Sequence, residues 1–182
     1  GYGELLVMPP LNGFPPMTVQ KKVLEAIAHG ISMGALIFLF GETGTGKSAI
    51  LETLSAEPKA WESMCRGAGI PYKPLRVYWI DMVLYETPGE LLAHRAIGDG
   101  RTYDEESELV AAIREADRNA DTCYNLIWLK ELGRVISSSV MGGLLNFFSV
   151  KFIRLPNGDM IDASRIAWVA DSNYNTEEKS VH

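Results

Sequence analysis

The feature that most constrains the fold of this chain is a glycine-rich segment from Gly41 to Ser48 (GETGTGKS), which directly follows an apolar run. The run, residues 35–40 (ALIFLF), is typical of a strand that is buried on both faces, as in a parallel sheet. The segment matches the pattern GxxxxGK[ST] at every fixed position. A buried strand, a glycine-rich turn and a helix in this order indicate an α/β domain with a mainly parallel sheet flanked by helices.

The spacing within this segment predicts a P-loop, a binding site for the phosphates of a nucleoside triphosphate. Glycines let successive backbone N–H groups converge on phosphate oxygens, and the following helix directs its N-terminal dipole at the same anion. Lys47 would reach the β- and γ-phosphates, and the Ser48 hydroxyl would hold Mg²⁺. The predicted nucleotide-binding residues are Gly41, Glu42, Thr43, Gly44, Thr45, Gly46, Lys47 and Ser48.

The rest of the chain alternates between strand-like and helix-like segments. Its composition of 47% hydrophobic residues suits one well-packed domain. Further strands are predicted at 76–82, 125–129 and 165–170. Helices are predicted at 18–33, with Thr18 as the N-cap, and at 48–55, 58–66 and 138–148. Another helix is predicted to follow a capping box formed by Thr102 and Glu105. A β-hairpin is predicted from 151–155 and 160–163 around the turn 156–159, whereas 85–103 reads as a short helix and loops. Residues 1–17, with prolines at 9, 10, 15 and 16, are predicted to be an extended linker.

Composition narrows the classes of function and the compartment. The net charge of −6 argues against a broad surface that binds nucleic acid nonspecifically, although it does not exclude a local basic loop. The two cysteines, Cys65 and Cys123, lie far apart and favour a reducing cytoplasm over a disulfide scaffold or a zinc site. The sequence has no stretch apolar enough to span a membrane and begins without a signal peptide or an initiator Met, so we expect a cytoplasmic piece of a longer protein.

Four features in order resemble the AAA+ ATPases, and among them the MoxR-like branch with a hairpin before sensor 1. They are the P-loop, the apolar strand that ends in Lys130-Glu131, the predicted hairpin, and the sequence ADSN that closes the last strand at Asn173. Family members commonly have Asp-Glu-Ile-Asn-Arg after the third strand, where this chain has KELGR, with Arg134 matching the family's arginine. The resemblance covers about residues 18 to 175.

The resemblance implies an ATPase that uses ATP and Mg²⁺, with Lys47, Glu131 and Asn173 as catalytic residues. Glu131 would orient the attacking water, and Asn173 would be the sensor-1 residue near the γ-phosphate. It also implies that the intact protein forms a ring of identical subunits with nucleotide at the interfaces.

One departure from the family pattern bears on turnover, because Lys130 stands where the family has the Walker-B aspartate. A cation beside Mg²⁺ costs about 4 kcal/mol per unit pair at 4 Å for an effective dielectric constant near 20. Three explanations are open. The lysine swings away while Ser48 and the phosphates hold the metal, Asp81 or Asp171 supplies the carboxylate, or the domain binds nucleotide and hydrolyses it poorly.

The family's ATPase unit continues with a fifth core strand, an arginine finger and a helical lid that carries a sensor-2 arginine. Too few residues follow the fourth predicted strand for a complete lid, so we expect residues 18–182 to be an AAA+ core truncated at its C-terminus. Three functions are compatible with this sequence. The first is an ATPase that remodels or activates a protein partner, which the acidic composition favours. The others are a nucleic-acid motor or loader and a nucleotide-gated assembly module with little or no hydrolysis.

Overall fold

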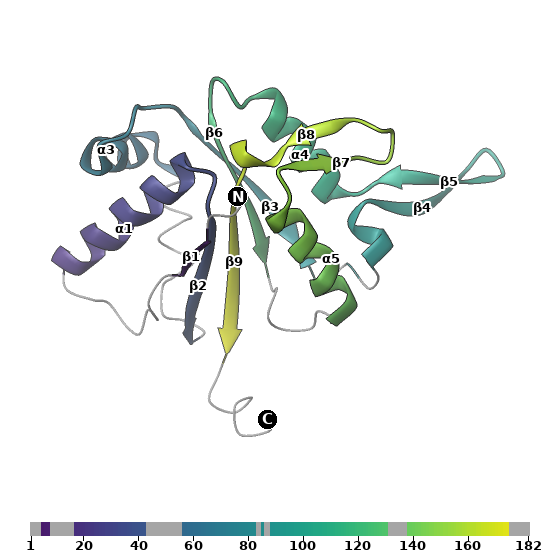
Figure 1. Ribbon diagram of the computed structural model, residues 1–182, viewed down its shortest axis with the longest axis horizontal. Coiled ribbons are helices and arrows are strands. Elements are labelled where there is room, and N and C mark those ends of the chain that lie inside the picture. The colour runs from purple at the N-terminus through teal and green to yellow at the C-terminus, as the bar shows by residue number, and fades with distance from the viewer. Residues whose placement is uncertain are drawn as a thin grey trace.

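The computed structural model describes residues 5–7, 17–42, 56–82, 85, 88–130 and 138–174. Within them, strands and helices alternate along the chain (Figure 1). The strands are β1 (Leu5–Val7), β2 (Leu36–Glu42), β3 (Leu75–Asp81), β4 (Ala93–Gly98), β5 (Arg101–Glu106), β6 (Tyr124–Lys130), β7 (Phe152–Arg154), β8 (Met160–Asp162) and β9 (Ala167–Tyr174). The helices are α1 (Met17–Ser32), α3 (Pro58–Ala68), α4 (Glu108–Arg118) and α5 (Ser138–Ser149), with short 3₁₀ turns η2 (Pro88–Leu91) and η3 (Ala163–Arg165).

The centre of the fold is a five-stranded sheet in the order β1-β2-β9-β6-β3, and every neighbouring pair in it is parallel. Residues 124–129 of β6 are all buried, and in β9 the described side chains from Ala167 to Ala170 are buried as well. Strands that are buried on both faces have continuous apolar sequences, which is why these two strands could be predicted from the sequence. The predicted α/β class with a parallel sheet flanked by helices is therefore confirmed.

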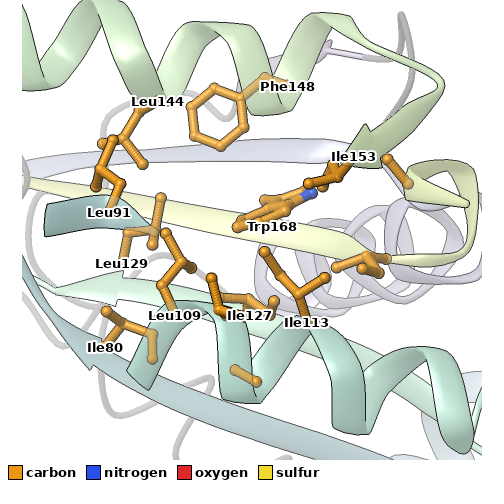
Figure 2. Close-up of a cluster of buried hydrophobic side chains, with 14 of the residues drawn as sticks. Ile80, Leu91, Leu109, Ile113, Ile127, Leu129, Leu144, Phe148, Ile153 and Trp168 are labelled. Atoms are coloured by element: carbon orange, nitrogen blue, oxygen red, sulfur yellow. The ribbon is translucent and has the colours of Figure 1, made fainter. Parts of the chain in front are cut away.

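Helices cover both faces of this sheet (Figure 1). On one face, α1 and α3 pack over a cluster that includes Ile27, Trp61 and Trp128. On the other face, α4 and α5 enclose a second cluster around Trp168, whose ring lies between Phe148 of α5 and Ile113 of α4 (Figure 2). The two clusters take alternate residues of the same strands, as the two-residue period of a strand requires.

A hairpin that was not predicted, formed by β4 and β5, projects from the body of the fold (Figure 1). The predicted short helix and loops at 85–103 are therefore wrong except for η2. The turn residues Asp99 and Gly100 both have positive φ angles, 53° and 72°, as a tight turn between antiparallel strands requires.

The predicted capping box of Thr102 and Glu105 is also wrong, because both residues lie in β5. The N-cap of α4 is Ser107, whose buried hydroxyl oxygen accepts a hydrogen bond from the Val110 N–H at 3.1 Å. The same hydroxyl donates to the Leu91 carbonyl at 2.6 Å, so Ser107 also ties the start of α4 to η2. A Thr-x-x-Glu pattern suggests the start of a helix, but here both residues belong to a strand that pairs with β4.

Two smaller differences from prediction concern the N-terminal part. Leu5–Val7, within the predicted linker, forms strand β1 and pairs with β2. Thr18 is the second residue of α1 and not its N-cap. Of the four tryptophans, Trp61, Trp128 and Trp168 are buried, and Trp79 is 38% exposed.

The hairpin predicted before the last strand is confirmed as β7 and β8, with the turn at Asn157 and Gly158. The predicted helix at 48–55 lies outside the described residues. None of the helices in the described part of the chain has the length and apolar character needed to cross a membrane.

Candidate functional site

The candidate site is the edge of the sheet where the parallel strands end at their carboxyl termini. In open α/β sheets this edge is where ligands bind. Four strand ends meet there: β2 ends at Glu42, β3 at Asp81, β6 at Lys130 and β9 at Tyr174. The predicted P-loop begins with the last two residues of β2, and Glu131 directly follows the last residue of β6.

Strand register brings one predicted catalytic residue beside the start of the predicted P-loop. Gly41 of β2 is aligned with Asn173 of β9, and Glu42 with Tyr174. Neighbouring strands lie about 4.8 Å apart, so the backbones of Gly41 and Asn173 are in contact. Of the other predicted site residues, Thr43 to Ser48 and Glu131 lie outside the described residues, as does Arg134.

The lysine that departs from the family pattern is held by two indole rings. The Nζ atom of Lys130 lies 4.5 Å from the ring centroid of Trp79 and 5.7 Å from that of Trp128. These two tryptophans are cross-strand neighbours on β3 and β6, and their ring centroids are 4.1 Å apart. An ammonium at this distance from an indole face is stabilised by about 0.5–2 kcal/mol, the larger value where water is excluded.

The position of this ammonium relative to β2 follows from the strand order. β6 lies between β9 and β3, and Trp79 belongs to β3, so Lys130 turns away from β9 and from β2 beyond it. Two strand spacings place the end of β2 about 10 Å from β6. At that distance the repulsion between the ammonium and a cation at the predicted P-loop falls to about 2 kcal/mol per unit pair for an effective dielectric constant near 20. Of the three explanations for Lys130, this geometry favours the one in which the lysine swings away.

The two carboxylates considered as substitutes are at different distances from β2. Asp81 ends β3, which is three strands from β2, or about 14 Å. Asp171 is on β9, the immediate neighbour of β2, where its backbone is aligned with Leu39. Strand order therefore places the backbone of Asp171 nearer to β2 than that of Asp81.

The described residues offer little for a metal ion without a phosphate ligand. No group of three or more His, Cys, Asp or Glu side chains among them could hold a metal. A Mg²⁺ ion that arrives with ATP needs few protein ligands, because phosphate oxygens and water supply most of its coordination. Ser48, the predicted protein ligand of Mg²⁺, lies outside the described residues.

A second polar feature, missed in the sequence, joins the two hairpins through Arg114 of α4. Its Nε donates to Glu106 at the end of β5 at 2.9 Å, and its Nη1 donates to Asp159 in the turn between β7 and β8 at 2.7 Å. The hydrogen bonds from Arg114 hold the pKa values of both carboxyls below their usual range, with Asn157 adding a second hydrogen bond to Asp159. The pairing of positions 106, 114 and 159 depends on tertiary structure, so no local pattern could reveal it.

The β7–β8 hairpin presents apolar and basic side chains to solvent. Phe152 and Met160 are about half exposed, and Lys151 and Arg154 are exposed beside them. Behind Phe152, a cavity of about 350 Å³ opens between this hairpin, α5 and η2, lined by Leu91, Leu92, Gly143, Asn146, Val150, Phe152, Ile153 and Arg154. An exposed aromatic ring between two cations is a surface that can contact either a protein or a nucleic acid.

The sequence matches no protein-family model, and a search of curated proteins finds no relative.

Proposed function

We propose that this chain is a P-loop nucleoside triphosphatase module of the AAA+ type that binds ATP with Mg²⁺, hydrolyses it, and remodels or activates a protein partner. The observation that carries the proposal is the position of the segment from Gly41 to Ser48. It starts at the carboxyl end of β2, inside a parallel sheet, with the backbone of Asn173 alongside. A phosphate-binding loop needs this strand before it so that its backbone N–H groups face the open edge.

Two observations support hydrolysis over a purely nucleotide-gated assembly module. Lys130, the residue directly before Glu131, ends β6 at the edge where β2 also ends. The Lys130 ammonium, which would oppose Mg²⁺, is held on Trp79 on the far side of β6. In the intact protein, the family resemblance implies a ring of identical subunits.

The substitution Lys47→Ala tests the binding step. We expect it to weaken ATP binding about tenfold, because it removes a charge-assisted contact to the β- and γ-phosphates. Titration with a fluorescent ATP analogue measures the dissociation constant. Lys59→Ala is the matched control, since Lys59 is an exposed lysine of α3. Equal affinities for ATP in the two variants would rule out the predicted P-loop.

The exposed residues Lys151, Phe152 and Arg154 favour a second candidate, a motor or loader that acts on single-stranded nucleic acid. Cations that contact phosphates give an affinity that falls steeply with salt, and an aromatic ring can stack on a base. Under this alternative, Lys151→Ala combined with Arg154→Ala should reduce the slope of log affinity against log salt by about 2. Fluorescence anisotropy with a labelled oligonucleotide measures it, and absence of salt-dependent binding by the unmodified protein removes the alternative.

A further inference from the structure

We propose that Trp79 is a positioning residue that keeps the Lys130 ammonium away from the metal-bound phosphates, and so permits Mg²⁺ at a site whose usual carboxylate is replaced by lysine. The inference deepens the proposed function and depends on it. Trp79 belongs to β3, which is three strands from β2, so its backbone lies about 14 Å from the strand that leads into the predicted P-loop.

The geometry gives the lysine a defined resting place. Lys130 and Trp128 are two residues apart on β6 and so lie on one face of the sheet, and Trp79 is aligned with Trp128 across the strand pair. The ammonium is 4.5 Å from the Trp79 ring centroid and 5.7 Å from that of Trp128, so both rings contribute to holding it.

Trp79 is itself held in place by packing against a buried neighbour. Trp128 has no exposed surface, and the ring centroids of the two tryptophans are 4.1 Å apart with an interplanar angle of 33°. Trp79 keeps 38% of its surface exposed, which leaves room for the ammonium to lie on the indole and remain partly hydrated. An indole ring whose position is fixed by a buried neighbour restrains a flexible lysine side chain more than solvent does.

Releasing the lysine has opposite consequences with and without the metal. With Mg²⁺ present, an ammonium free to turn toward β2 repels the metal–nucleotide complex. Without Mg²⁺, the same ammonium attracts the bare phosphates. The ratio of ATP affinity in Mg²⁺ to that in EDTA therefore reports where the lysine is, whereas general damage to the fold lowers both affinities together.

The experiment measures this ratio by titration with a fluorescent ATP analogue. Trp79→Leu, which removes the π face, should lower the ratio about 3- to 10-fold, the range that a cation–π contact supports. Trp79→Phe should keep most of it. In the Lys130→Met background, Trp79→Leu should leave the ratio unchanged, because there is no ammonium to release.

A second readout needs no nucleotide. In the free protein, the ring currents of the two indoles should shift the NMR signals of the Lys130 side-chain methylenes upfield, and Trp79→Leu should remove most of that shift. Normal methylene shifts in the unmodified protein would overturn the inference. So would an unchanged affinity ratio in Trp79→Leu, or an equal loss in the Lys130→Met background. Upfield shifts in a protein that binds no ATP would confirm the resting place of the lysine and overturn both the proposed function and the role of Trp79 in it.

Discussion

Replacing Glu131 with glutamine is expected to lower steady-state ATP turnover about 100-fold or more while ATP binding is retained. The substitution keeps the size of the side chain and removes the carboxylate that would orient and deprotonate the attacking water, a contribution of about 10²- to 10⁴-fold. Lys130, the residue before Glu131, ends β6 at the edge of the sheet where β2 also ends. Phosphate release at saturating ATP and Mg²⁺ measures turnover.

The matched control is Glu57→Gln, because Glu57 is an exposed carboxylate just before α3. It should leave turnover unchanged. Normal turnover in Glu131→Gln would contradict the assignment of Glu131 as the group that activates water. If the unmodified protein binds ATP tightly without turnover, and Glu131→Gln changes nothing, the nucleotide-gated assembly module becomes the better description.

The sequence was a good guide to the buried strands because burial on both faces leaves an unmistakable composition. The segment at 125–129 was predicted as a strand, and β6 extends it by only one residue at each end. The strand at 35–40 corresponds to β2, and the predicted hairpin to β7 and β8. These elements have a local cause: apolar runs that end in glycine or turn residues.

The β4–β5 hairpin could not be predicted from hydrophobic pattern, because it projects from the body and its strands carry many polar residues (Figure 1). The one local signal was the pair Asp99-Gly100, a dipeptide that favours tight hairpin turns. The pattern of Thr102 and Glu105 suggested a capping box instead, which is wrong because both residues lie in β5. The true cap, Ser107, has its hydroxyl committed to both Val110 and Leu91.

The strands that carry the predicted site residues could be predicted from the sequence, but the direction of the Lys130 side chain could not. The order of motifs located Gly41, Lys130 and Asn173, and their strands do end at a common edge. The direction of the Lys130 side chain depends on the alignment of Asp81 with Lys130 and of Trp79 with Trp128. That register joins segments far apart in the sequence, so only the folded sheet could reveal it.

Replacing Trp168 with alanine is expected to destabilise the fold by about 3–5 kcal/mol, the usual cost of deleting a large buried aromatic ring. Trp168 has no exposed surface and lies on β9, between β2 and β6. Its ring packs edge-to-face on Phe148, with centroids 5.4 Å apart, at the centre of the cluster between α4 and α5 (Figure 2). Urea unfolding followed by circular dichroism gives the free energy of unfolding.

Trp168→Phe separates the packing of the ring from the cost of its polar atom. Among the described residues, the buried indole N–H of Trp168 has no hydrogen-bond acceptor. Phenylalanine removes that unpaired donor and leaves a smaller cavity, so its loss of stability should be less than half that of alanine. Tyr72→Ala, at a tyrosine that is about half exposed, should change the free energy of unfolding by less than about 1 kcal/mol. If Trp168→Ala were as stable as Tyr72→Ala, the stability of the sheet would not depend on this ring. That result would contradict the packing of α5 on β9 through Trp168.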